Sequence, residues 1–188
     1  MELILREVEP SVERPIFSEQ FLAHLQGPYY DQKVEKNRIL QERFTLTENE
    51  LNEVNAKHYC KWTYFSSSYS WNLLLLWFSD TKIGVDLEMK KERSYSLLEQ
   101  YEESLALLWW KTWDNFYLLW SWREAIIKAS DSCYIEDGEK IYFVKSKKEE
   151  NYFDTLNFSH VLEFDYNWKQ WIVYLYSNEE YVYALTQR

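Results

Sequence analysis

Glycine is scarce in this chain: its 188 residues include three, Gly27, Gly84 and Gly138. Phosphate-cradling P-loops and the dinucleotide fingerprint of Rossmann folds need several glycines within a few positions, because the backbone must approach the phosphates closely. Three glycines this far apart exclude both motifs. Any phosphate that the protein binds must therefore be held by cations and side chains.

Cysteine is scarce as well, and charge is biased to one sign. Cys60 and Cys133 lie far apart without metal-ligand spacing, so the sequence predicts no disulfide framework and favours a reducing, cytoplasmic environment. The formal net charge of −10 argues against a general nucleic-acid-binding protein. An acidic protein partner would need a local basic patch. The run Lys90-Lys91-Glu92-Arg93 could supply one, although short charged runs are usually solvated loops.

Long apolar runs are missing too. The longest, residues 71–78, is interrupted by Asn72 and is too short to span a bilayer. The N-terminus lacks a basic start followed by an apolar stretch, so we expect no signal peptide and no membrane partner. Aromatic residues, in contrast, make up 19% of the chain. We interpret them first as packing in half-buried sheets, with an exposed ligand-stacking surface as the alternative.

Hydrophobic periodicity predicts an α+β fold. Expected strands are 2–8, 61–66, 71–78, 82–88, 158–165, 169–176 and 180–186, with Asp137-Gly138 as the turn of a hairpin joining 134–135 to 141–143. Expected helices are 18–25 (ended by Gly27-Pro28), a helical region in 31–57 with a capping box at 47–50, and 94–129, where Asp114 caps the second of two helices. This order predicts two related α+β halves, 1–80 and 81–188, with antiparallel sheets packed against helices.

Two short stretches carry the candidate chemistry. On a strand over 83–88, Gly84, Asp86 and Glu88 share one face, and the opposite face is expected to be the core face. On a helix over 120–128, Glu124 and Lys128 lie on one side. Three carboxylates and a lysine are suited to holding a divalent cation against a diphosphate, and without that cation at least one carboxyl pKa should rise. Taken singly, Glu124 and Lys128 could equally be an ion pair on the surface of a helix. Asp86 and Glu88 could equally be polar residues at the exposed end of a strand.

These residues resemble the signature of the 4'-phosphopantetheinyl transferases. That signature has a glycine-aspartate pair on a strand and, after a gap of the length found here, a tryptophan, a small hydroxyl residue, a basic-acidic pair and a lysine. Gly84 and Asp86 match its first part. The second part is matched by Trp120, Ser121, Glu124, Ala125 and Lys128, with Arg123 where the family has a lysine. Many members also have a serine-histidine-serine motif upstream, where this chain has Tyr69 between Ser68 and Ser70.

The resemblance implies a magnesium-dependent enzyme that transfers 4'-phosphopantetheine from coenzyme A to a serine of an apo acyl or peptidyl carrier protein. It implies a monomer built as a pseudo-dimer of two similar halves. The metal ligands would be Asp86, Glu88 and Glu124, and the catalytic residues Glu124 and Lys128. The coenzyme contacts would be Ser68, Tyr69, Arg123 and Lys128.

Several positions depart from the family pattern. Tyr69 replaces a histidine by a neutral donor. The segment that often carries a general base has no clear match; Glu102 and Glu103 are its candidates, and Arg38 and Arg43 are candidates for the coenzyme's basic contacts. Two alternatives therefore stay open: a weak or inactive relative that binds a carrier protein or assembly partner, and an unrelated aromatic-rich ligand-binding protein.

Overall fold

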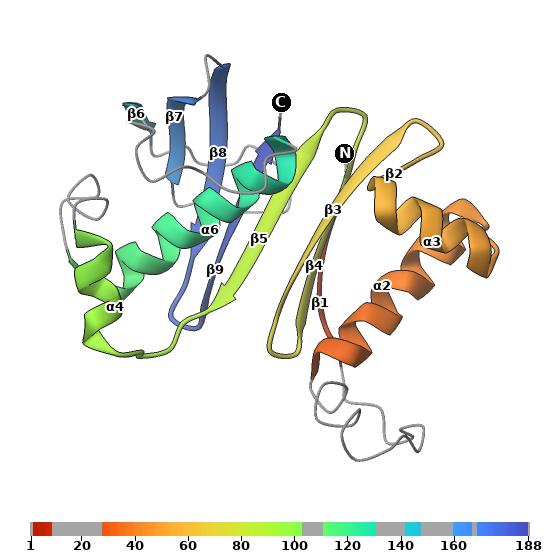
Figure 1. Cartoon of the computed structure of the whole chain (residues 1–188), viewed down its shortest axis with the longest axis horizontal. Helices are drawn as coiled ribbons and strands as arrows, with labels where there is room; N and C mark the ends of the chain where they lie inside the picture. Colours follow the sequence, from red (N-terminus) through yellow and green to blue (C-terminus); the bar gives the residue numbers. More distant parts are fainter. Residues whose placement is uncertain are drawn as a thin grey trace. The chain divides into compact units, whose positions relative to one another are not determined.

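The computed structural model describes residues 2–8, 28–102, 111–130, 142–147, 160–166 and 169–187 (Figure 1). The chain divides into two compact units, Met1–Asp80 and Thr81–Arg188. Each contains an antiparallel sheet and helices, so the α+β fold class is confirmed. The helix expected at 18–25, the turn at Asp137-Gly138 and Glu103 lie outside the described residues. Among the helices that are described, none is both long and apolar enough to cross a membrane.

The first unit has a four-stranded sheet in the order β1-β4-β3-β2. Its strands are β1 (Glu2–Glu7), β2 (Tyr59–Cys60), β3 (Thr63–Ser70) and β4 (Leu73–Ser79). The strand expected at 61–66 begins later, because Lys61 and Trp62 have φ of 46° and 66° and form a turn. Trp71, with φ of 53°, likewise belongs to a turn, so β4 begins at Leu73.

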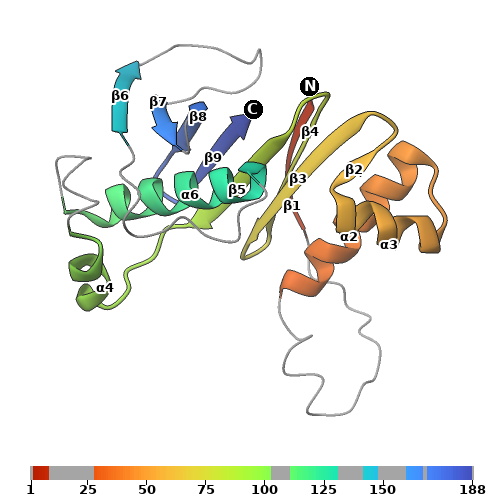
Figure 2. The same cartoon turned by 45° about the horizontal axis from the view of Figure 1, so that its top comes forward.

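Two helices pack on one face of this sheet, α2 (Pro28–Phe44) and α3 (Glu48–Lys57) (Figure 2). Pro28 begins α2, because the first helical position needs no backbone N–H. The capping box is confirmed: the Thr47 N–H donates to Glu50 Oε2 at 2.8 Å, and the Thr47 hydroxyl accepts from the Glu50 N–H. The buried core consists of Ile39, Leu40, Phe44, Leu51, Val54, Cys60, Phe65, Leu74, Leu76 and Phe78.

The second unit has a five-stranded antiparallel sheet in the order β5-β9-β8-β7-β6. Its strands are β5 (Ile83–Met89), β6 (Tyr142–Lys147), β7 (His160–Tyr166), β8 (Lys169–Ser177) and β9 (Tyr181–Gln187). The strands expected at 82–88, 158–165, 169–176 and 180–186 are confirmed to within two residues. The alternating and apolar patterns there were therefore sufficient to locate them.

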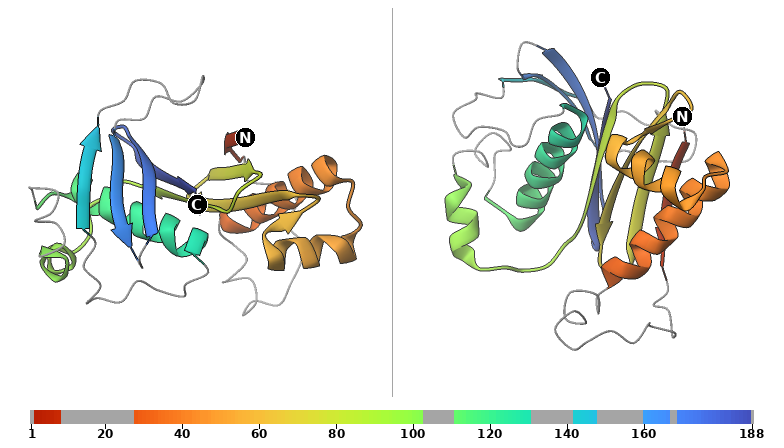
Figure 3. Two further views of the ribbon diagram at one scale, coloured as in Figure 1. Left: turned by 90° about the horizontal axis from the view of Figure 1, so that it is seen from above. Right: turned by 45° about the vertical axis from the view of Figure 1, so that its right-hand side comes forward.

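Helices α4 (Tyr95–Gln100) and α6 (Trp113–Ser130) belong to the same unit, and α6 lies along the sheet (Figure 3). The residue that caps α6 is Thr112 and not Asp114, because the Thr112 hydroxyl accepts from the Asn115 N–H at 3.2 Å. Asp114 lies in the first turn, where its negative charge still favours the helix.

The core of the second unit lies between α6 and the sheet. Its buried members include Phe116, Leu119, Trp122, Ile126, Trp171, Val173, Leu175, Val182 and Ala184. Asp86 pairs with Ala184 and Glu88 with Val182, so the face that carries Gly84, Asp86 and Glu88 is the one that α6 covers. The opposite face, with Ile83, Val85 and Leu87, is buried as expected. Both faces of β5 are therefore covered, which the sequence did not indicate.

Candidate functional site

Strand β5 and helix α6 are in backbone contact at Gly84. A Cβ atom at this position would lie 1.8 Å from the Ala125 carbonyl oxygen and 2.9 Å from the Ala129 nitrogen. Because these are backbone atoms, no side chain could move aside to make room. The helix contributes small residues to its buried side, namely Ser121, Ala125 and Ala129, all of them fully buried. The glycine and the alanine of the motif thus permit a close strand–helix contact.

This contact brings Lys128 to Asp86. The Lys128 ammonium donates to Asp86 Oδ1 at 2.8 Å and to the Val85 carbonyl oxygen at 3.0 Å. The Asp86 side chain is 6% exposed and the Lys128 side chain 28%. Removing a carboxylate from water is costly, and the Lys128 ammonium compensates the charge of Asp86. The lysine is therefore part of a partly buried ion pair between two elements.

The charge of Asp86 also acts on Glu88 and Glu124, which together with Asp86 are named the acidic group. Burial and, after it, the charge of Asp86 raise the pKa of Glu88 to about 7, although Arg93 and Lys128 oppose the rise. Burial and then Asp86 also raise the pKa of Glu124. The expected rise in at least one carboxyl pKa is therefore found at two positions. Its causes show that β5 and α6 gather like charges in a poorly solvated place.

The carboxylates fit magnesium in chemistry, because this ion prefers oxygen ligands. In the part of the chain that the structure describes, however, no three acidic, histidine or cysteine side chains are grouped so that they could hold a metal ion. Asp86 is instead paired with Lys128. The three-carboxylate metal site therefore stays a prediction.

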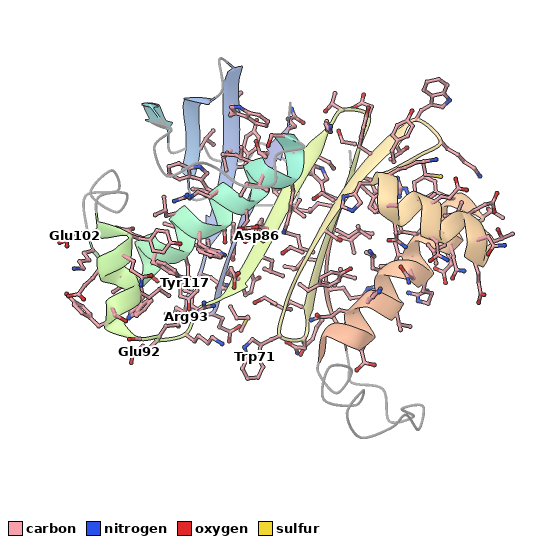
Figure 4. The ribbon with its side chains drawn as sticks, viewed as in Figure 1. Trp71, Asp86, Glu92, Arg93, Glu102 and Tyr117 are labelled. Carbon is pink, nitrogen blue, oxygen red and sulfur yellow. The ribbon has the colours of Figure 1, made fainter. Side chains whose placement is uncertain are left out.

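The residues that follow β5 are tied to α6 by Tyr117. This side chain is 1% exposed. Its hydroxyl donates to the Lys91 carbonyl oxygen at 2.6 Å and accepts from the Lys91 N–H at 3.1 Å. The Arg93 guanidinium lies over its ring, 5.7 Å from the centroid (Figure 4). Sequence reasoning identified the basic run but missed Tyr117, because an aromatic residue on a helix reads as core packing.

Two ion pairs connect the basic run to its surroundings. Lys90 pairs with Asp114 at 2.8 Å, and its side chain is 13% exposed. Arg93 approaches Glu88 at 3.9 Å, with 37% of its side chain exposed. The backbone N–H of Lys90 donates to the Glu180 carbonyl oxygen at 2.7 Å, the last such bond before the chain leaves the sheet. The run is therefore held beside the acidic group.

Other predicted site residues are engaged in packing or in ion pairs. Tyr69 packs against the core of the first unit, and Ser68 is buried on the other face of β3. The Arg123 guanidinium lies 5.9 Å from the centroid of the Tyr101 ring, and Trp120 packs edge-to-face against the same ring. Trp120 also packs against the core of the second unit.

The candidate base and the candidate basic contacts also have partners. Glu102 is exposed and pairs with Lys111 at 3.5 Å. Arg38 bonds Glu35 and Glu42 on its own helix. The Arg43 guanidinium lies 4.1 Å from the centroid of the Phe78 ring. None of these contacts by itself indicates a ligand.

Comparison with known proteins adds no assignment, since the chain matches no protein-family model and no curated protein sequence. The interpretation of the site therefore depends on its own residues. The contact at Gly84, the Lys128–Asp86 pair and the raised pKa values of Glu88 and Glu124 are the observations that carry it.

Proposed function

We propose that the protein is a magnesium-dependent 4'-phosphopantetheinyl transferase. It would move phosphopantetheine from coenzyme A to a serine hydroxyl of an acyl or peptidyl carrier protein. The observation that supports this most is the partly buried Lys128–Asp86 pair beside Glu88 and Glu124. These are the positions at which the resemblance puts the metal ligands and the phosphate-contacting lysine. The pseudo-dimeric arrangement of that family belongs to the same proposal.

The energetics of the group favour a function over a purely structural role. A buried ion pair contributes little net stability, because desolvation offsets most of the Coulomb attraction. Two further carboxylates with raised pKa values beside the pair add repulsion. Such perturbed groups are concentrated at functional sites, where a ligand supplies the missing charge.

The proposed reaction breaks a diphosphate, so negative charge develops on phosphate oxygens and must be stabilised. Bound magnesium would neutralise part of that charge. Asp86, Glu88 and Glu124 would hold the ion. Lys128, which now compensates Asp86, would then direct its ammonium to the phosphate oxygens. Arg123 adds a second cation next to Glu124 with several fixed donors.

A second candidate is a weak or inactive relative that binds a carrier protein or an assembly partner. Tyr69 favours it, because its ring packs against the core of the first unit and so takes the role of a packing residue. Arg38 favours it too, because two glutamates on its own helix already bond its guanidinium. Under this reading the carboxylates are a remnant of the site.

Intact-mass measurement of carrier proteins tests both candidates. Each member of a panel of apo carriers is incubated with the protein, coenzyme A and Mg²⁺, and we expect one carrier to gain one phosphopantetheine group. Asp86→Asn should abolish the gain. Asp114→Asn, which changes an exposed aspartate on α6, is the matched control. Carrier binding without a mass gain would favour the second candidate, and neither binding nor gain would contradict both.

A further inference from the structure

Tyr117 holds the backbone at the point where the sheet ends. Lys90 makes the last bond to β9 through the Glu180 carbonyl oxygen. The backbone N–H and C=O of the next residue, Lys91, are both bonded by the Tyr117 hydroxyl. A buried hydroxyl that donates and accepts has satisfied its hydrogen-bonding groups. Tyr117 thus fixes the backbone of the first residue beyond the last hydrogen bond between β5 and β9.

The same side chain seats Arg93. Its ring lies under the Arg93 guanidinium at 5.7 Å, a separation at which a cation is attracted to an aromatic face. The guanidinium approaches Glu88 at 3.9 Å, which is too long for a hydrogen bond. The Arg93 guanidinium therefore lies near the acidic group without a hydrogen bond to Glu88. Lys90, in contrast, forms a close ion pair with Asp114 at 2.8 Å.

We propose that Arg93 contacts a phosphate of coenzyme A and that Tyr117 is the residue that positions it. This inference rests on the proposed function and names a cation that the family resemblance does not supply. An arginine suits the task because its planar fork presents paired donors to phosphate oxygens.

Coenzyme A affinity in the presence of Mg²⁺, measured by calorimetry, tests the contact. We expect Arg93→Gln to weaken binding about tenfold, as for the loss of one charge-assisted hydrogen bond. Lys57→Gln, which removes an exposed charge from α3, should leave affinity unchanged. Affinity in Arg93→Gln equal to that of the unchanged protein would overturn the inference. A wild-type chain that binds no coenzyme would instead contradict the proposed function together with it.

Tyr117→Phe tests the positioning, because it keeps the ring and removes the hydroxyl. Hydrogen exchange of the Lys91 amide should accelerate by about two- to tenfold, while amides within β5 stay protected. The KM for coenzyme A should rise with little change in kcat. Tyr101→Phe, which alters the same aromatic cluster, is the matched control.

A double variant separates positioning from general support of the fold. If Tyr117 acts through Arg93, then Tyr117→Phe should weaken coenzyme binding no further when Arg93 is already glutamine. Fully additive losses, or unchanged exchange of the Lys91 amide in Tyr117→Phe, would overturn the positioning role. Thermal unfolding of each variant shows whether it is folded.

Discussion

Gly84→Ala is the most informative single perturbation of the candidate site. The new methyl carbon would lie 1.8 Å from the Ala125 oxygen, and real contacts of this kind stay beyond 3.0 Å, so α6 must retreat by about 1.2 Å. The same shift would stretch the 2.8 Å contact between Lys128 and Asp86 beyond hydrogen-bonding distance. One substitution is therefore expected to loosen the core and open the ion pair.

The expected loss in the free energy of unfolding is about 2–4 kcal/mol, which combines overpacking with a weakened pair. Urea denaturation followed by tryptophan fluorescence measures it, because Trp122 is fully buried in the affected core. Ala125→Gly should not rescue the variant, since the obstructing atoms belong to the backbone. Combining Gly84→Ala with Lys128→Met should give less than additive losses.

Two results would refute this reasoning. A loss below about 0.5 kcal/mol, the range of an ordinary surface substitution, would show that the close contact is not present. Rescue by Ala125→Gly would show that a side chain, and not the helix backbone, sets the distance.

Three further predictions concern single side chains. The folded-state pKa of Glu88 is about 7, above its ordinary value of 4.5, so between these pH values the folded state binds a proton that the unfolded state has released. Without Mg²⁺, the free energy of unfolding should therefore fall as pH rises from about 4.5 through 7. The expected loss, discounted for screening, is on the order of 1–2 kcal/mol. Glu88→Gln should flatten that dependence in thermal melts, and an unchanged slope would contradict the assignment. Lys128→Ala should lower the free energy of unfolding in urea by about 1–3 kcal/mol, because Asp86 stays buried without its partner. The control Lys57→Ala, at an exposed ion pair, should lower it by less than about 0.5 kcal/mol. Equal losses would make Lys128 an ordinary surface residue. Tyr69→His should cost about 1–2 kcal/mol because its ring packs against the first core, and tighter coenzyme A binding at mildly acidic pH would instead place that residue at the ligand.

Local features of the fold were readable from the sequence because they depend on neighbours along the chain. The capping box at Thr47 and Glu50 satisfies groups within one turn, and strand periodicity located β5, β7, β8 and β9. The start of the strand expected at 61–66 was wrong, because bulky residues such as Lys61 and Trp62 are unusual in turns with positive φ.

The face of β5 that carries the helix was decided only by the tertiary structure. Alternation along a strand separates two faces but does not say which of them a helix covers. Here α6 covers the face of Gly84 and Asp86, because only a strand without a Cβ at this point admits the helix backbone. The sequence by itself therefore identified Gly84 as part of the motif, and the packing of α6 on β5 explains why a glycine is needed there.

The partners of the site residues were decided in the same way. The sequence by itself determined that Glu124 and Lys128 share one side of a helix, since helical geometry brings residues four apart together. That Lys128 reaches Asp86, and that Tyr117 bonds Lys91, depends on how α6 is placed against β5. Contacts between residues distant in the chain are set by packing and register, which no local pattern encodes.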